Sequence, residues 1–177
     1  MQLIALSLLI FGFILIIGSI LYFTLSYGIS PMPSSSKAIS QIRLLIPKPT
    51  LGNIYELGSG WGHLAILLAK DNPQCQVYAY EISPIPWFVS YTIAKCLRIN
   101  NLSIERKDFF NVPLNDATII VCYLYVEAMR NLKEKFKQEL KPGTLIISNT
   151  FSVPKWEAKK VYYLNDCYQT PIYVYEI

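Results

Sequence analysis

Residues 55–62 have the sequence Tyr55-Glu56-Leu57-Gly58-Ser59-Gly60-Trp61-Gly62, and the apolar run His63-Leu64-Ala65-Ile66-Leu67-Leu68-Ala69-Lys70 follows them. This pattern predicts a buried strand, a glycine-rich turn and a helix. Glycines allow a positive φ and close approach to a ligand, and the start of the helix offers unpaired N–H groups at the positive end of its dipole. A second strand-like run ends at Glu81, about 20 residues further on, where a nucleotide-binding α/β unit places the carboxylate that binds a ribose.

The spacing of the glycines distinguishes this turn from two other phosphate-binding loops. A dinucleotide fingerprint requires G-x-G-x-x-G, whereas His63 stands at the place of the third glycine, and the lysine of a P-loop is missing. Instead, the acidic Glu56 precedes Gly58 by two positions, and Glu81 lies downstream. This order of acid, glycines and second acid resembles motif I of the seven-strand (class I) S-adenosylmethionine-dependent methyltransferases. The alternative is a glycine turn that only packs a helix against a strand.

The resemblance implies S-adenosylmethionine as the cofactor and assigns residues to its parts. It places Glu56 near the methionine part and Glu81 on both ribose hydroxyls. The backbone that passes under the sulfonium and the ribose would be that of Gly58, Ser59, Gly60 and Gly62. The family commonly has an acidic or polar residue on the adenine amino group after its third strand, which implies Asp108, with Phe109 flanking the ring. On the residues alone, Glu81 and Asp108 are also suited to capping a helix or a turn.

The N-terminal segment, 1–28, predicts a single transmembrane helix. No charged residue precedes Lys37, and the run at 3–27 is almost continuously apolar. As a helix it would be about 37 Å long, enough to cross a hydrocarbon core of about 30 Å. A cleaved signal peptide is the alternative, because Ser26-Tyr27-Gly28 is a small-x-small site, but no basic residue precedes the run and it exceeds the usual h-region of about 7–15 residues.

Charge and composition bear on location and partners. Lys37, Arg43 and Lys48 follow the apolar run, so the positive-inside rule predicts a single-pass membrane protein with its catalytic domain in the cytoplasm. The net charge of +4 suits a domain beside a lipid bilayer, and the lack of a basic cluster argues against nucleic acid as a partner. The four cysteines form no C-x-x-C pair and accompany a single histidine, so we expect reduced, mostly buried thiols and no metal site.

The remaining sequence predicts one α/β domain. Residues 29–50 contain a turn-forming linker and a short amphipathic helix at 37–46, capped by Ser35 or Ser36. Within 51–177 we expect strands at 53–57, 76–81, 102–107, 117–123 and 144–149, helices at 61–70, 84–98 and 126–140, and β-rich runs at 160–164 and 171–177. This alternation predicts a Rossmann-like, mostly parallel seven-strand sheet with helices on both faces and an antiparallel hairpin at one edge.

The segment after the fourth predicted strand, Cys122-Tyr123-Leu124-Tyr125, bears on the acceptor. Methyltransferases that act on amide or exocyclic base nitrogens resemble one another in having Asn/Asp-Pro-Pro-Tyr here, and this chain has neither the proline nor the carboxylate. Tyr123 and Tyr125 are our candidate catalytic residues, because their ring faces and hydroxyls suit a cationic amine. The alternative is that both only pack the edge of the core.

A narrower resemblance rests on segments spread over most of the chain. They are the apolar N-terminal run, the Pro-x-Pro-Ser linker, motif I, Tyr80-Glu81-Ile82-Ser83-Pro84, Asp108-Phe109 and the run from Asn149 to Trp156. Together they resemble the small membrane-anchored lysine methyltransferases that include the ATP synthase c-subunit lysine methyltransferase. The resemblance implies that Pro33 and Ser34 form part of a lid, and we add Phe151 and Trp156 as substrate contacts.

The implied function is N-methylation of a lysine on a membrane-associated protein. One alternative is methylation of a lipid-soluble small molecule such as a quinone or a phospholipid headgroup. Another is a non-catalytic membrane scaffold that retains the fold, against which the two acids, Glu56 and Glu81, and the three glycines of the turn argue.

Overall fold

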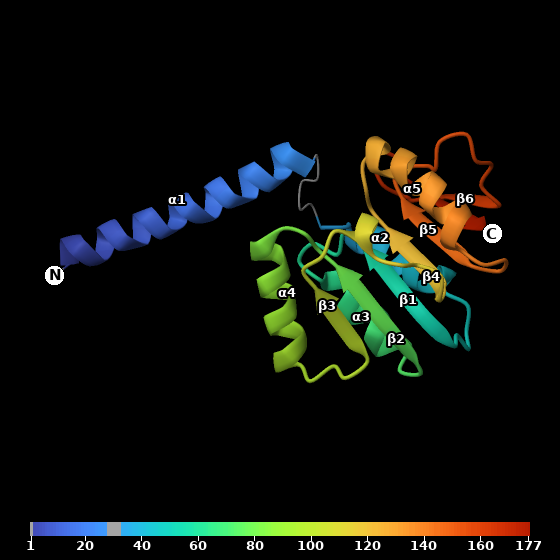
Figure 1. Ribbon diagram of the computed structural model, residues 1–177, viewed down its shortest axis with the longest axis horizontal. Coiled ribbons are helices and arrows are strands. Elements are labelled where there is room, and N and C mark those ends of the chain that lie inside the picture. The colour runs from blue at the N-terminus through green and yellow to red at the C-terminus, as the bar shows by residue number, and fades with distance from the viewer. Residues whose placement is uncertain (1, 28–32) are drawn as a thin grey trace.

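The computed structural model describes residues 2–27 and 33–177, so that positions 28–32 of the expected linker lie outside the described residues. One long helix, α1 (Gln2–Tyr27), projects from an α/β body that contains all the described strands (Figure 1). The other helices are α2 (Ser36–Leu45), α3 (His63–Asp71), α4 (Pro84–Cys96) and α5 (Val126–Glu139), with a 3-10 turn, η1 (Phe109–Asn111). The strands are β1 (Gly52–Leu57), β2 (Cys75–Tyr80), β3 (Leu102–Glu105), β4 (Ala117–Cys122), β5 (Leu145–Asn149), β6 (Lys160–Tyr163) and β7 (Pro171–Glu176).

The seven strands form one sheet in the order β3-β2-β1-β4-β5-β7-β6. Neighbouring strands from β3 to β5 in that order are parallel, whereas β7 is antiparallel to both β5 and β6. The predicted mostly parallel sheet with an antiparallel hairpin at one edge is therefore confirmed. The direction of winding reverses between β1 and β4, and open α/β sheets bind ligands at the carboxyl ends of strands beside such a reversal.

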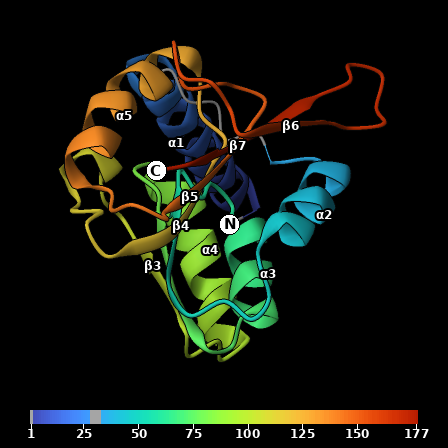
Figure 2. The ribbon, with the colours of Figure 1, turned by 90° about the vertical axis from the view of Figure 1, so that its right-hand side faces the viewer.

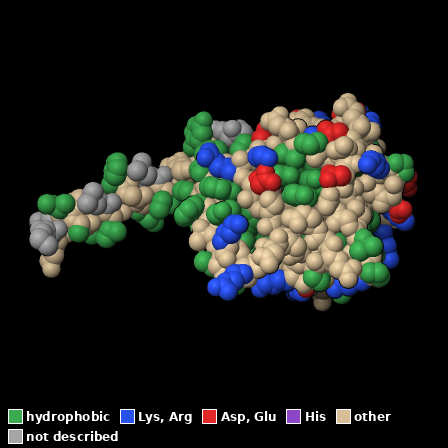
Figure 3. All heavy atoms as spheres, turned by 60° about the horizontal axis from the view of Figure 1, so that its bottom comes forward, with side chains coloured by type: hydrophobic (Ala, Val, Ile, Leu, Met, Phe, Trp, Pro, Cys, Tyr) green, Lys and Arg blue, Asp and Glu red, His purple; other side chains and the backbone are tan. Residues whose placement is uncertain are grey.

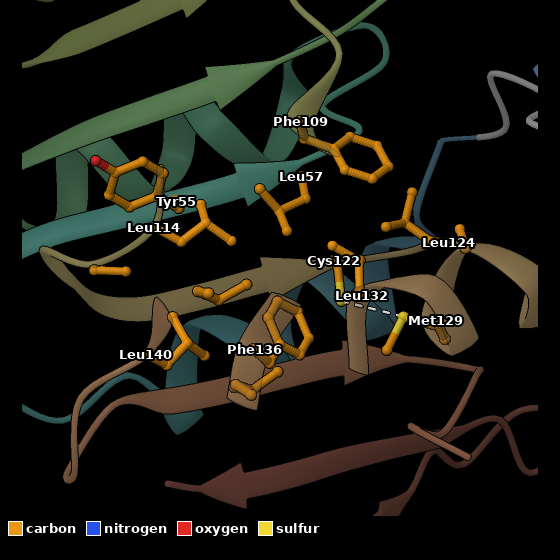
Figure 4. Close-up of a cluster of buried hydrophobic side chains, with 14 of the residues drawn as sticks. Tyr55, Leu57, Phe109, Leu114, Cys122, Leu124, Met129, Leu132, Phe136 and Leu140 are labelled. Carbon is orange, nitrogen blue, oxygen red and sulfur yellow. Dashed lines mark hydrogen bonds between the residues drawn. The ribbon is translucent and has the colours of Figure 1, made fainter. Parts of the chain in front are cut away.

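Helices cover both faces of the sheet (Figure 2). On one face α2 and α3 bury Ile42 and Leu68 against the strands, and α4 extends the layer beside β3. On the other face Met129, Leu132 and Phe136 of α5 pack on β1, β4 and β5, as Figure 4 shows. Because both faces of the central strands are buried, their sequences are continuous apolar runs rather than alternating ones.

The expected amphipathic helix is α2, and it is packed on the body. The Ser35 hydroxyl caps it by accepting a hydrogen bond from the Ala38 N–H at 3.2 Å. Ala38 and Ile42 are buried against the sheet, and Arg43 forms an ion pair with Asp71 of α3. The segment that begins at Pro33 is thereby fixed above the sheet.

Helix α1 has the length and composition of a candidate membrane span. Its segment Ile4–Thr24 has 21 residues and a mean hydropathy of 2.8. The helix expected over this run is present; that it crosses a membrane, and in which direction, stays a prediction.

Candidate active site

The glycine turn joins β1 to α3 and is fixed by its neighbours. The N–H groups of Gly58 and Ser59 both donate to the Tyr80 carbonyl at the end of β2, at 3.0 and 2.9 Å. Gly58, Gly60 and Gly62 have φ values of 77°, 54° and 76°, a region that side-chain-bearing residues rarely adopt.

The three glycines differ in what a side chain would meet. A Cβ at Gly58 would lie 2.8 Å from Cδ2 of Leu124, and one at Gly62 would lie 2.6 Å from Cβ of Ser90 on α4. A Cβ at Gly60 would have no described heavy atom within 4 Å. Packing thus accounts for Gly58 and Gly62, whereas the open space at Gly60 belongs to a cavity.

Glu81, directly after β2, connects the turn to α4. Its side chain is only 4% exposed; Oε2 accepts the Gly60 N–H and Oε1 accepts the Ser83 N–H, both at 2.8 Å. The N–H that Glu81 accepts at α4 belongs to Ser83, the N-cap residue that precedes the helix, so the alternative of a helix cap is met only in part. The two hydrogen bonds leave each carboxylate oxygen a second acceptor site, and Glu81 also lines the cavity.

Glu56, in β1, is the second buried acid of the site, with 6% of its surface exposed. Its carboxyl accepts a hydrogen bond from the Ala65 N–H in the first turn of α3. Burial, together with repulsion from Glu81 and against the effect of the Ala65 hydrogen bond, raises the pKa of Glu56 to about 8. Its Oε2 and the Ser59 hydroxyl have no hydrogen-bond partner among the described residues, so the site has unused polar capacity, which is costly when buried.

A cavity lies at the carboxyl ends of β1, β2 and β4. It holds about 600 Å³ of space, a figure that includes the solvent at its open mouth. Among the residues expected at the site, those that line it are Pro33, Ser34, Glu56, Gly58, Ser59, Gly60, Glu81 and Tyr123.

Other lining residues were not expected there. They are Ile39, Ile42, His63, Leu64, Val121 and Cys122. Ile39 and Ile42 form the apolar face of α2, which from the sequence predicted only packing. Cys122 is no nucleophile at neutral pH, because burial raises the pKa of its thiol to about 12.

The two residues expected at the adenine lie outside this lining. Asp108 caps η1, accepting the Phe110 N–H at 2.9 Å. Phe109 is buried in the core on the α5 side of the sheet, with its ring centroid 4.6 Å from that of Phe110. Their contact with a cofactor stays a prediction.

The residues expected around the acceptor fall into two groups. Phe151 stacks on Tyr123, with ring centroids 6.4 Å apart, so it extends the aromatic wall of the cavity. Trp156 instead packs between Phe136 and Tyr175 in the core, and Tyr125 occupies the N-cap position of α5. The latter two do not line the cavity, and their roles stay predictions.

A polar contact ties the segment at Pro33 and Ser34 to the sheet. Asn149, at the end of β5, lies with Nδ2 3.4 Å from the Ser34 hydroxyl oxygen. Asn149 is buried; the sequence placed it at the end of a strand but assigned no contact to it. Sequence positions more than a hundred residues apart therefore meet at the rim of the cavity.

The chemistry of the cavity wall favours a particular kind of ligand. Two buried carboxyls face it, one of them with a free acceptor atom, which suits a molecule that carries a cationic group and hydroxyls. The open Cα side of Gly60 lets such a molecule approach the backbone.

Comparison with known proteins identifies the family. The model of the ANTKMT methyltransferase domain matches residues 56–160. A protein-lysine N-methyltransferase of Saccharolobus islandicus (strain REY15A) is 31% identical over 76% of this chain and 84% of its own length. The adenine nucleotide translocase lysine N-methyltransferase of Mus musculus is 27% identical over 70% of this chain, and the match spans about half, 53%, of that relative.

A solved structure agrees in fold. An RNA methyltransferase from Salinibacter ruber, crystallised with S-adenosyl-L-homocysteine, superposes with a TM-score of 0.73 at 21% identity, over 82% of this chain and 94% of that one. The seven-strand sheet, the position of the acid-and-glycine motif and the match to the family model agree with one another. The chain therefore belongs to the ANTKMT methyltransferase domain family and is a seven-strand S-adenosylmethionine-dependent methyltransferase.

Proposed function

We propose that this enzyme is a membrane-anchored protein-lysine N-methyltransferase whose acceptor is a lysine on a membrane-associated protein, with the catalytic domain in the cytoplasm. The observation that carries the proposal is the cavity between the two acids and the glycine turn, covered by the segment that follows α1. The names of the two relatives support lysine as the acceptor, and the candidate span Ile4–Thr24 supports the membrane as its location.

The polar groups of the cavity fit the cofactor. S-adenosylmethionine supplies a methyl group activated on a sulfonium. Glu81 would accept hydrogen bonds from the ribose hydroxyls while keeping its bonds to the Gly60 and Ser83 N–H groups. Glu56 would face the cationic amino-acid end, where its unpartnered Oε2 gains a donor. The backbone of Gly60 leaves the space that the ligand needs.

The acceptor side is aromatic. Tyr123 lines the cavity and stacks on Phe151, so a lysine side chain can pass along ring faces that attract its cationic form. The amine must be deprotonated before it attacks the methyl group. We assign to the Tyr123 hydroxyl the task of orienting the neutral amine in line with the methyl group, since alignment of this kind supplies most of the catalysis in a direct transfer.

The lid connects the cavity to the anchor. Ile39 and Ile42 of α2, together with Pro33 and Ser34, close one side of the cavity, and α2 follows α1 after a short segment. A helix fixed in the bilayer would hold the cavity near the surface and raise the effective concentration of membrane-bound acceptors.

Transfer of a radiolabelled methyl group into membrane fractions tests the proposal. We expect the label in protein, as methyl-lysine, and much less of it with a Glu81→Ala enzyme as control. Mass spectrometry of the membrane proteome with and without the enzyme would then identify the acceptor. Label in extractable lipid, with lysine methylation unchanged, would replace the lysine assignment by the small-molecule alternative.

A further inference from the structure

The outward side of α4 is unusual for a surface helix. Helix α4 packs on the body through Pro86, Ser90 and Ala94. Its opposite side carries a stripe of exposed residues at helical spacing, which we call the α4 outer face: Phe88, Tyr91, Thr92, Lys95 and Cys96. Spacings of three, four, seven and eight residues place these side chains on one side of a helix.

The α4 outer face offers mainly apolar groups. Phe88 is 61% exposed. The Thr92 hydroxyl donates to the Phe88 carbonyl at 2.7 Å, so its methyl group is left to face outward. The Lys95 ammonium lies 5.5 Å from the centre of the Tyr91 ring, a cation–π contact that keeps the charge beside an aromatic ring.

Helix α5 shows what a water-facing helix of this protein looks like. Its outward side carries charged residues that pair along the helix, Arg130 with Glu127 and Lys137 with Glu134. The difference between the two helices is thus local and cannot be ascribed to the composition of the chain as a whole.

The position of α1 indicates what the α4 outer face meets. Helix α1 packs against α4, and Figure 1 shows α1 leaving the body on the side where α4 lies, with α4 running across its direction. A bilayer crossed by α1 would therefore extend along α4. Figure 3 shows hydrophobic side chains gathered where α1 joins the body, with Lys and Arg side chains beside them.

The charges near α4 agree with a lipid surface. Lys95 and Arg98 are both exposed, at the end of α4 and just after it. Basic residues at this position favour contact with anionic headgroups, while aromatic rings such as those of Phe88 and Tyr91 are typical of the layer between headgroups and acyl chains.

We infer that the α4 outer face rests on the bilayer surface and fixes the orientation of the catalytic domain relative to the membrane. This inference rests on the anchoring by α1 proposed above and adds a second contact to it. With two contacts the domain cannot turn freely about the end of α1, so the cavity keeps one direction towards acceptors in the same bilayer.

Two native cysteines provide the test. Cys96 lies on the α4 outer face and Cys167 on the β6–β7 connection; both are exposed, whereas Cys75 and Cys122 are buried. The full chain is placed in nanodiscs of phosphatidylcholine and phosphatidylglycerol, as Cys167→Ser and as Cys96→Ser, and labelled with a water-soluble maleimide. Because a thiol at the lipid interface is shielded from the reagent, we expect Cys96 to react about tenfold more slowly than Cys167.

A matched pair of variants identifies the cause of the protection. Phe88→Glu should bring the labelling rate of Cys96 to within about twofold of that of Cys167, since it places a charge in the contact. Tyr163→Glu, at an aromatic residue on β6 that is slightly more exposed than Phe88 (70% against 61%), should leave the rate at Cys96 unchanged.

Extraction of membranes with alkaline carbonate tests the anchoring by α1 separately from the contact of the α4 outer face with lipid. A wild-type chain that is retained, with Cys96 labelled as fast as Cys167, overturns the α4 contact and leaves the anchor standing. A chain that is extracted overturns both. Protection of Cys96 only when two chains share a nanodisc would assign the α4 outer face to a second copy and overturn the lipid assignment.

Discussion

Glu81 contacts both the glycine turn and the residue before α4, and it also lines the cavity. Its carboxylate already holds the glycine turn and the start of α4. Replacing it with Ala removes the proposed ribose acceptor and two hydrogen bonds to the turn and to Ser83, so we expect the affinity for S-adenosylmethionine to fall by about 1.5–3 kcal/mol. Calorimetry measures this, with Glu105→Ala, a nearby acid outside the cavity, as the control. Equal affinity in a folded Glu81→Ala enzyme would contradict the assignment.

The raised pKa of Glu56 predicts how cofactor binding depends on pH. Its pKa is raised to about 8 by burial, so at neutral pH the free enzyme carries it mostly protonated, and a cationic ligand favours the ionised form. Affinity should therefore rise from pH 6 to pH 8.5, with proton release visible as a dependence of the calorimetric heat on the buffer. Glu56→Gln should remove this pH dependence; its persistence in that variant would assign it to another group.

The same carboxyl affects stability in a defined direction. Its pKa in the folded chain, about 8, lies above the reference value of 4.5, so protonation favours the folded state. The contribution is complete below about pH 4.5, declines between about pH 4.5 and 8, and is absent above that window. The difference in melting temperature between the wild-type enzyme and Glu56→Gln should follow this course.

Substitution of Tyr123 distinguishes effects on the acceptor from effects on cofactor binding. Tyr123→Phe keeps the ring stacked on Phe151 and removes only the hydroxyl, so we expect kcat to fall about 10-fold or more while the affinity for S-adenosylmethionine stays the same. Tyr125→Phe should change kcat less, because Tyr125 does not line the cavity. Steady-state kinetics would measure kcat, and calorimetry would measure the affinity for S-adenosylmethionine. A loss of cofactor affinity in Tyr123→Phe would assign the residue to the cofactor instead of the acceptor.

At the scale of the elements, the glycine turn combines two different requirements. Gly60→Ala meets no described atom, so the fold should survive at a cost of about 1 kcal/mol for the positive φ, while the methyl group enters the cavity and weakens binding. Gly62→Ala meets Ser90 and should lower the melting temperature more. Thermal denaturation and calorimetry on the pair check this; a Gly60→Ala enzyme that binds normally would mean that no ligand approaches the turn.

The order and type of the elements were predictable because they depend on local patterns. The strands and helices of the body occur where alternation and caps indicated them, with some ends displaced by a few residues. Ser35 caps α2 and Pro84 begins α4, as the sequence predicted. The parallel direction of the central strands also followed, since helical crossovers join parallel strands.

The direction of single side chains was less predictable. Asp108 satisfies the nearest free N–H, in η1, and Trp156 finds two aromatic partners in the core. Ile39 and Ile42 reach the cavity only because α2 folds back over the sheet. Such placements depend on contacts between residues distant in sequence, which the local periodicity of apolar residues does not indicate. The expectation of mostly buried thiols failed for the same reason at Cys96 and Cys167.

At the scale of the whole molecule, anchor, lid and cavity follow one another along the chain. Pro33 and Ser34, a few residues after α1 in the sequence, line the cavity, and Ser34 contacts Asn149 at the carboxyl end of β5. The proposed anchor therefore lies outside the cavity, whereas residues that follow it in the sequence line the cavity. Its removal should change which acceptors are reached, and leave cofactor binding as it is.

Deletion of residues 1–27 tests this division. The truncated enzyme should bind S-adenosylmethionine as the full chain does and should methylate a short lysine peptide in solution at the same rate. On an acceptor embedded in vesicles its rate should fall at least about tenfold, because the two reactants no longer share a surface. A fusion of the body to an unrelated single-pass helix is the control: it should recover the rate on the embedded acceptor where tethering alone is needed. If contact between α1 and α4 also orients the domain, the fusion should recover only part of that rate. Equal rates for the full and truncated enzymes on vesicles would show that α1 takes no part in reaching the acceptor.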